Sequence, residues 1–194
     1  MCYVSSTIAG YFIEKSNKES APLSVLQLIK LVYISHGWNL VLNDTPLISD
    51  RIEAWKYGPV MPSLHSLFEG QNLTKDDLIE DFLIEEANCI KFVHRILLNK
   101  VYAKYKHLTG DEFTNLMHQK DTPWYSVWDN GAGKDHPINN AATKLYYSHQ
   151  INKTTFDSLP EYPSIESKEE AVRFLIKSGI LLEDGNLNPI YKNS

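Results

Sequence analysis

The stretch that constrains this fold most is Ile52-Glu53-Ala54-Trp55-Lys56-Tyr57-Gly58-Pro59-Val60-Met61-Pro62. Gly58 allows a tight bend, and Pro59 and Pro62 fix φ where the chain enters a helix. Trp55 supplies a large apolar side chain that can anchor the bend against a core. Because the preceding residues also include Pro46, we expect residues 45–60 to form a structured connection without a long regular element.

A long apolar helix is predicted before this connection. Ser24-Val25-Leu26-Gln27 fits a capping box, and apolar residues then fall on one face until Asn43-Asp44 ends the helix. The residues of that face are Leu28, Leu31, Val32, Ser35, Trp38 and Leu42. We expect it to be the central core helix, linked to the connection by an ion pair of Lys30 with Glu53.

Further helices are predicted on both sides of this pair of segments. Apolar spacing and capping residues predict helices at 5–16 after a Ser5/Ser6 cap, at 62–70, at 74–86, at 88–106, from Thr109 to Gln119 and from Asn139 to Ile151. These patterns predict an all-α helical bundle as a first domain, residues 1–151.

A second, smaller unit is predicted at the C-terminus. Pro160 and Pro163 mark a linker, after which Ser167 caps a helix that ends at Gly179. Asp184-Gly185 then favours a two-residue hairpin turn between short apolar strands. Residues 160–194 are therefore expected to form a helix plus a β-hairpin.

Composition and charge restrict the class of protein. The 194 residues carry a net charge of −5, which argues against nucleic acid as a partner because such binding depends on Lys and Arg neutralising phosphates. We expect no secretory signal, because the first residues lack a basic start and an apolar run, and no membrane span, because Lys30 and His36 interrupt the most apolar segment. Cys2 and Cys89 have no metal-ligand or redox spacing, so we expect reduced thiols and a cytoplasmic location.

No catalytic motif is visible. The sequence has no nucleophile elbow, phosphate loop or dinucleotide fingerprint, and its histidines lack metal-ligand spacing. Those histidines, for which ordinary structural roles are expected, are His36, His65, His94, His107, His118, His136 and His149. We therefore expect no enzyme activity, no metal and no cofactor.

Three blocks of sequence, taken in order, resemble the Panacea domain of SocA-like antitoxins. Lys30-Leu31-Val32-Tyr33 resembles the end of the family's core helix, and Glu53 through Val60 resembles its acid-Ala-Trp-x-x-Gly-Pro-Val loop. His118 to Trp124 resembles its Thr-His-x-x-x-Pro-Trp stretch, with Met117 in place of the hydroxyl residue and one extra residue before Pro123. The family-like residues are Lys30, Leu31, Tyr33, Glu53, Ala54, Trp55, Gly58, Pro59, Val60, Pro62, His118, Pro123 and Trp124.

The resemblance implies an antitoxin of a toxin–antitoxin system, of the kind associated with phage defence, that binds and neutralises a cognate toxin. Two other roles stay open, a proteolytic adaptor that delivers the toxin to a chaperone-protease and a DNA-binding autoregulator. An enzyme would need a pocket of perturbed titrating groups that the sequence does not indicate.

Side chains for partner binding are sought among exposed aromatic residues, which concentrate interface energy, although the same residues also suit a core. The candidates are Trp55, Tyr57, Met61, Trp124, Tyr125 and Trp128. Because the resemblance ends before residue 160, two roles stay open for the C-terminal unit: it shares in toxin recognition, or it only packs onto the helical bundle.

Overall fold

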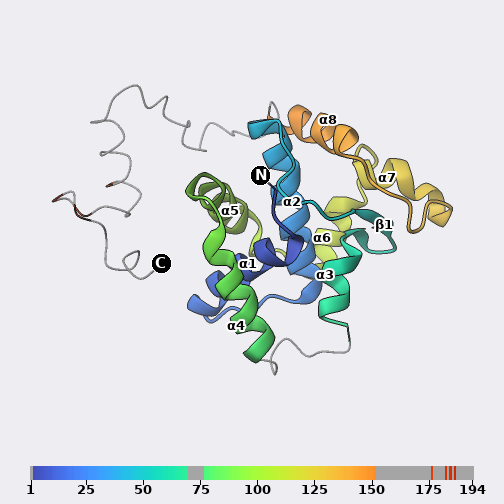
Figure 1. Cartoon of the computed structure of the whole chain (residues 1–194). Coiled ribbons are helices and arrows are strands. Elements are labelled where there is room, and N and C mark those ends of the chain that lie inside the picture. The colour runs from blue at the N-terminus through green and yellow to red at the C-terminus, as the bar shows by residue number, and fades with distance from the viewer. Residues whose placement is uncertain are drawn as a thin grey trace. The chain divides into compact units, whose positions relative to one another are not determined.

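The computed structural model describes residues 2–69 and 77–151 and the single positions 176, 182, 184 and 186. Its contacts divide the chain into two units, Met1–Lys153 and Thr154–Ser194. The first unit is mainly helical with one short hairpin, which confirms the all-α prediction (Figure 1).

The secondary structure of the first unit alternates helices with short connections. The described α-helices are α1 (Ser5–Lys18), α2 (Val25–Asn43), α3 (Pro62–Leu67), α4 (Asp77–Glu86), α5 (Phe92–Tyr105), α6 (Gly110–Met117), α7 (Pro123–Trp128) and α8 (Asn140–Ile151). Short 3-10 helices lie at Ala87–Cys89 and Asp129–Gly131. Strand β1 (Glu53–Trp55) pairs antiparallel with β2 (Gly58–Val60).

Helix α2 is the core of this unit. The predicted capping box is confirmed, because the Ser24 side chain accepts from the Gln27 amide while Gln27 accepts from the Ser24 amide. Every residue from Leu28 to Leu40 is buried, so the helix is covered on all sides and not only on the predicted face. It contacts α1, α3, α5, α6, α8 and β2, and Figure 1 shows it running through the middle of the described helices.

The same helix is long and apolar enough to cross a membrane by length and composition. However, 72% of its most apolar window is buried inside the folded unit, as expected of a core helix. Lys30 and His36, which interrupt the apolar run, are both buried there.

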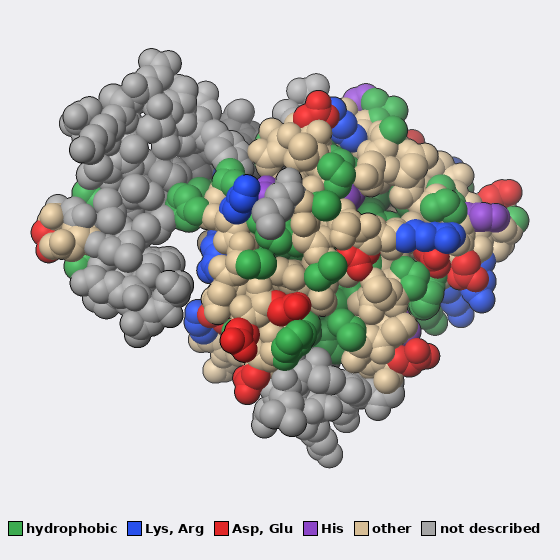
Figure 2. Space-filling view, in the orientation of Figure 1, with side chains coloured by type: hydrophobic (Ala, Val, Ile, Leu, Met, Phe, Trp, Pro, Cys, Tyr) green, Lys and Arg blue, Asp and Glu red, His purple; other side chains and the backbone are tan. Residues whose placement is uncertain are grey.

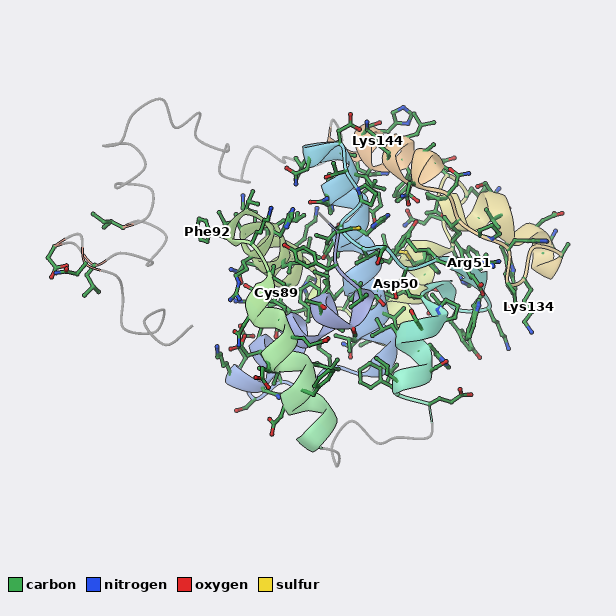
Figure 3. All side chains as sticks on the ribbon, in the orientation of Figure 1. Asp50, Arg51, Cys89, Phe92, Lys134 and Lys144 are labelled. Carbon is green, nitrogen blue, oxygen red and sulfur yellow. The ribbon has the colours of Figure 1, made fainter. Side chains whose placement is uncertain are left out.

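Helix α1 begins differently from the prediction. The expected Ser5/Ser6 cap is wrong, because the N-cap position is Val4, which has no side-chain cap. Instead, the amide and the hydroxyl of Ser5 each donate to the Asp50 carboxylate at 2.7 Å. The Ser63 hydroxyl donates to the same carboxylate, so Asp50 joins the starts of α1 and α3 (Figure 3). A negative charge at this position also complements the helix dipole.

Two other predicted helix starts are confirmed. Thr109 and Glu112 form a capping box at α6, and the Asn139 side chain accepts from the Ala142 amide at 2.8 Å at α8. Helix α5 begins at Phe92, later than predicted, because the 3-10 turn before it occupies the expected first residues.

The predicted C-terminal helix and hairpin lie almost wholly outside the described residues. At the described positions, the Leu182 amide donates to the Asn186 carbonyl at 2.8 Å. The Asp184 carboxylate accepts from the Asn186 amide at 2.9 Å, and position 184 lies in a turn. The bounds 1–151 and 160–194 stay a prediction.

Candidate functional site

The expected connection at residues 45–60 contains a short β-hairpin that was not predicted. Glu53 is paired with Val60, Ala54 with Pro59 and Trp55 with Gly58, which leaves Lys56 and Tyr57 as the turn. The positive φ that closes the turn, 106°, falls on Gly58. Glycine adopts this conformation without the steric cost that a side chain would add.

The ladder explains why a proline is tolerated in β2. In an antiparallel pair, residues alternate between bonding each other and pointing their backbone groups outward. Ala54 points outward, since its amide donates to the His136 carbonyl and its carbonyl accepts from the Asp135 amide, both at 2.9 Å. Its partner Pro59 therefore also points outward, and the missing N–H of Pro59 costs the ladder nothing.

The outer edge of β2 is held by Lys30 from α2. Its side chain is fully buried, and Nζ donates to the Pro59 carbonyl at 2.8 Å. The predicted ion pair of Lys30 with Glu53 is wrong, because Glu53 pairs with Arg51 at 3.0 Å and accepts from the Trp55 indole at 3.0 Å. Burial away from water lowers the pKa of Lys30 to about 7.

Gly58 also allows α2 and the hairpin to approach closely. A Cβ placed on Gly58 would lie 2.9 Å from the Lys30 Nζ and 3.1 Å from the Met117 Cβ. The glycine is therefore required both by its backbone conformation and by the space that the lysine occupies.

An aromatic stack holds the other side of the hairpin. The Trp124 indole donates to the Trp55 carbonyl at 2.8 Å. The Trp124 ring lies parallel to His118, with 3.9 Å between centroids, and stacks on Trp128 at 5.2 Å. Thr122 caps α7 through the Tyr125 amide, which orients Trp124 toward the hairpin.

His118 lies close enough to Lys30 for the two charges to interact. Burial and the positive charge of Lys30 both lower the pKa of His118, while a hydrogen bond with the Lys56 backbone acts in the opposite direction. Its Nε2 is buried and has no hydrogen-bond partner.

The structure thus gathers most of the family-like residues around the hairpin. The exceptions are Leu31 and Tyr33, which are buried elsewhere along α2, where the Tyr33 ring meets Tyr147 of α8 edge-on. Sequence reasoning missed residues 135–138, whose backbone covers β1, and Asp50, which caps α1 from 45 residues away. Neither shows a local signal, because each acts on a distant segment.

The candidate partner-binding residues divide by exposure. Tyr57 is 54% exposed and Tyr125 is 45% exposed. Trp55 and Trp128 are half-buried. Met61 and Trp124 are buried, so their side chains are covered by this unit itself. We call Trp55, Tyr57, Tyr125 and Trp128 the hairpin–α7 surface.

Charges of both signs surround this surface. Arg51 and Lys134 lie on the same side of the unit as β1 and α7 (Figure 3), and each is paired with a neighbouring acid. On the face shown in Figure 2, basic and acidic side chains of the described residues are interspersed. Within residues 2–69 and 77–151, no group of three or more His, Cys, Asp or Glu side chains is placed to hold a metal ion.

Comparison with known proteins shows that the three family-like blocks lie within the range of a known family. Residues 28–125 match the family described as antitoxin SocA-like, Panacea domain, and this range holds all three family-like blocks. Antitoxin SocA of Caulobacter vibrioides (strain NA1000 / CB15N) is 28% identical over 134 residues, which cover 65% of this chain and 70% of the relative. No solved structure matches the chain significantly. The chain belongs to the SocA-like antitoxin family with a Panacea domain.

Proposed function

We propose that this protein neutralises a cognate toxin by binding it directly in the cytoplasm, without catalysis of its own. Family membership supports the antitoxin role. The observation that supports direct binding is the exposure of Tyr57 and Tyr125 on two elements that contact each other, the hairpin and α7. Tyrosine and tryptophan side chains carry much of the energy in protein interfaces.

The anchoring of the hairpin by several elements also favours a binding role. Lys30 holds the edge of β2, Trp124 holds the carbonyl of Trp55, and residues 135–138 cover the free edge of β1. A surface that is already ordered loses little conformational entropy when a partner docks, and more of the contact energy then appears as affinity.

Two basic residues in and directly after α5, Arg95 and Lys106, do not favour the DNA-binding alternative. Arg95 donates to the carbonyls of Ala87 and Ile90, where it closes the turn before its own helix. Lys106, directly after α5, forms an ion pair with Glu19 at 2.6 Å. These side chains already have structural partners within the unit.

Growth of a bacterial host that expresses the protein together with the product of its neighbouring gene tests this function. We expect the neighbour to be toxic alone and the pair to be harmless. The double variant Tyr57→Ala and Tyr125→Ala should lose protection, while Leu145→Ala, which removes an exposed apolar residue of α8, should retain it. Toxicity that persists beside the wild-type protein would contradict the proposal.

The adaptor alternative is separated by the amount of toxin in the rescued cells. Neutralisation by binding leaves the toxin level unchanged, whereas delivery to a chaperone-protease lowers it and depends on that protease. A rescue that disappears in a protease-deficient host would favour the adaptor.

A further inference from the structure

The burial of Lys30 is unusual in its lack of a countercharge. Its side chain is fully buried, and no carboxylate of the described residues lies within ion-pair distance of its ammonium group. A buried charge is costly, and apolar side chains of similar volume are often equally or more stabilising at such positions. Stability alone therefore does not account for a lysine at this place.

The one side-chain hydrogen bond that Lys30 makes to the described residues identifies what the ammonium group does. Because Pro59 points outward from the ladder, its carbonyl has no partner in β1, and Lys30 satisfies it from α2. On the other strand, Trp124 of α7 holds the carbonyl of Trp55. The turn at Lys56 and Tyr57 thus lies between two anchors that come from different helices.

We propose that Lys30 is the positioning residue of the hairpin–α7 surface, because its hydrogen bond to the Pro59 carbonyl fixes how the hairpin presents Trp55 and Tyr57 beside α7. A methionine of similar length fills the same space but cannot donate to the carbonyl. The role of this geometry in toxin binding rests on the proposed function, whereas the geometry itself is measurable without a toxin.

The charge of Lys30 gives this role a dependence on pH. Charge-assisted hydrogen bonds are roughly twice as strong as neutral ones, so the hairpin is held less tightly once Lys30 loses its proton. The hairpin, α3 and α6 all contact α2, and their acidic, basic and histidine side chains are Glu53 and Lys56, His65, and Asp111 and Glu112, with His118 directly after α6. None of them contributes to the lowered pKa of Lys30, which comes from burial, whereas His118 senses the Lys30 charge.

Stability and hairpin geometry should respond to pH separately. The pKa of Lys30 is about 7 in the folded protein and 10.5 in an ordinary lysine. Between pH 7 and pH 10.5, Lys30 therefore carries its proton more often in the unfolded chain than in the folded protein. The contribution of Lys30 to the free energy of unfolding consequently increases as pH rises from 7 to 10.5. A lysine that contributes only to stability would change the free energy of unfolding with pH but would leave the geometry of the hairpin unchanged.

The test compares the indole N–H groups of the purified wild-type protein, Lys30→Met and Lys100→Met by nitrogen–proton NMR. Lys100 is the matched control, since burial also lowers its pKa, to about 8, on α5. We expect Lys30→Met to shift the Trp55 and Trp124 signals and to speed exchange of the Trp124 proton roughly tenfold to a hundredfold. Trp38, on α2, should be unchanged in every protein.

Two results would overturn the positioning role. The first is a folded Lys30→Met protein whose Trp55 and Trp124 signals match those of Lys100→Met. The second applies even if Lys30→Met fails to fold, because the wild-type protein can be titrated alone. Its Trp55 and Trp124 signals should follow the ammonium of Lys30 with a midpoint near pH 7, separate from any step below pH 6.5 due to His118. Trp55 and Trp124 indole signals that do not shift as Lys30 titrates would contradict the proposal.

Co-expression with the toxin then links positioning to function. A folded Lys30→Met protein should lose protection while Lys100→Met keeps it. If even the wild-type protein fails to protect, the proposed function is wrong, yet the NMR result still decides whether Lys30 positions the hairpin. Full protection by Lys30→Met with displaced indole signals would show that hairpin position does not govern toxin binding, and would overturn that part of the inference.

Discussion

The replacement Gly58→Ala should destabilise the protein by two separable effects. Gly58 has a φ of 106°, a conformation that costs a residue with a side chain about 1–3 kcal/mol. Its new Cβ would also meet the Lys30 Nζ at 2.9 Å and the Met117 Cβ at 3.1 Å. The Met117 Cβ is fixed by its helix, so Lys30 must move, and a displaced charged hydrogen bond costs about 1.5–3 kcal/mol more.

Gly131→Ala is the matched control. Gly131 has a similar φ of 101°, but a Cβ there would meet only Trp128, at an ordinary 3.8 Å. Both variants share the backbone cost, and the difference between their free energies of unfolding measures the contact with Lys30. We expect Gly58→Ala to be less stable than Gly131→Ala by about 1.5–3 kcal/mol, or about 3–12 °C in Tm for a chain of this size.

Urea and thermal unfolding followed by circular dichroism provide the comparison. Equal losses of stability in the two variants would refute the close approach of Lys30 to the hairpin. A smaller loss in Gly58→Ala would refute in addition the strained conformation assigned to Gly58.

Three further predictions address acid stability, helix capping and the C-terminal unit. Burial lowers the pKa of His36 below its ordinary 6.5, so the unfolded chain takes up a proton first as pH falls, and the free energy of unfolding should decrease below about pH 6.5. Urea titrations between pH 5 and 8 should show a smaller decrease in His36→Gln, and an equal decrease would count against this assignment. Asp50→Ala should lower the free energy of unfolding by about 1–3 kcal/mol, because it removes the cap of α1. Glu14→Ala, which removes one partner of a surface ion pair, should lower it by no more than about 1 kcal/mol. Similar losses in urea unfolding of the two variants would contradict the capping role. Deletion of residues 160–194 should leave the helical circular dichroism spectrum intact and weaken toxin binding, whereas binding at full strength by the truncated protein would rule out a recognition role for this unit.

Local sequence patterns predicted the helices well because their starts depend on neighbouring residues. The capping boxes at Ser24 and Thr109 each need a partner only three residues away, and both are confirmed. The apolar face of α2 predicts its central place, whereas the burial of its other sides depends on the elements that pack around it, α1, α3, α5, α6, α8 and β2.

The errors concern contacts between distant segments. The cap of α1 comes from Asp50, which lies 45 residues from Ser5, so no local pattern reveals it. The acceptor of Lys30 is a backbone carbonyl, and sequence gives no reason to prefer it over the nearby carboxylate of Glu53. Local patterns predict only a structured connection at residues 45–60, because β1 and β2 are three residues each and depend on α2, α7 and the chain at 135–138 for support.

The sequence predicted which segments form the candidate site but not which of their side chains are exposed, because exposure also depends on contacts between distant segments. The family-like blocks identified the segments that meet around the hairpin, although their spacing says nothing of which side chains reach the surface. Tyr57, on the hairpin turn, and Tyr125, on α7, are exposed. Met61 and Trp124 are instead buried among other residues of the first unit. Exposure depends on tertiary packing, which the aromatic pattern alone does not determine.

The most direct test of the proposed function is the affinity of the purified protein for the toxin encoded beside it, measured by isothermal titration calorimetry. Phe82→Ala is the matched control for Tyr57→Ala, because Phe82 of α4 is 59% exposed and Tyr57 is 54% exposed. We predict a stable complex with the wild-type protein, a loss of roughly thirtyfold or more for Tyr57→Ala and little change for Phe82→Ala. Loss of affinity in Phe82→Ala alone would place the interface on another surface. Absence of binding by the wild-type protein would contradict neutralisation by direct binding.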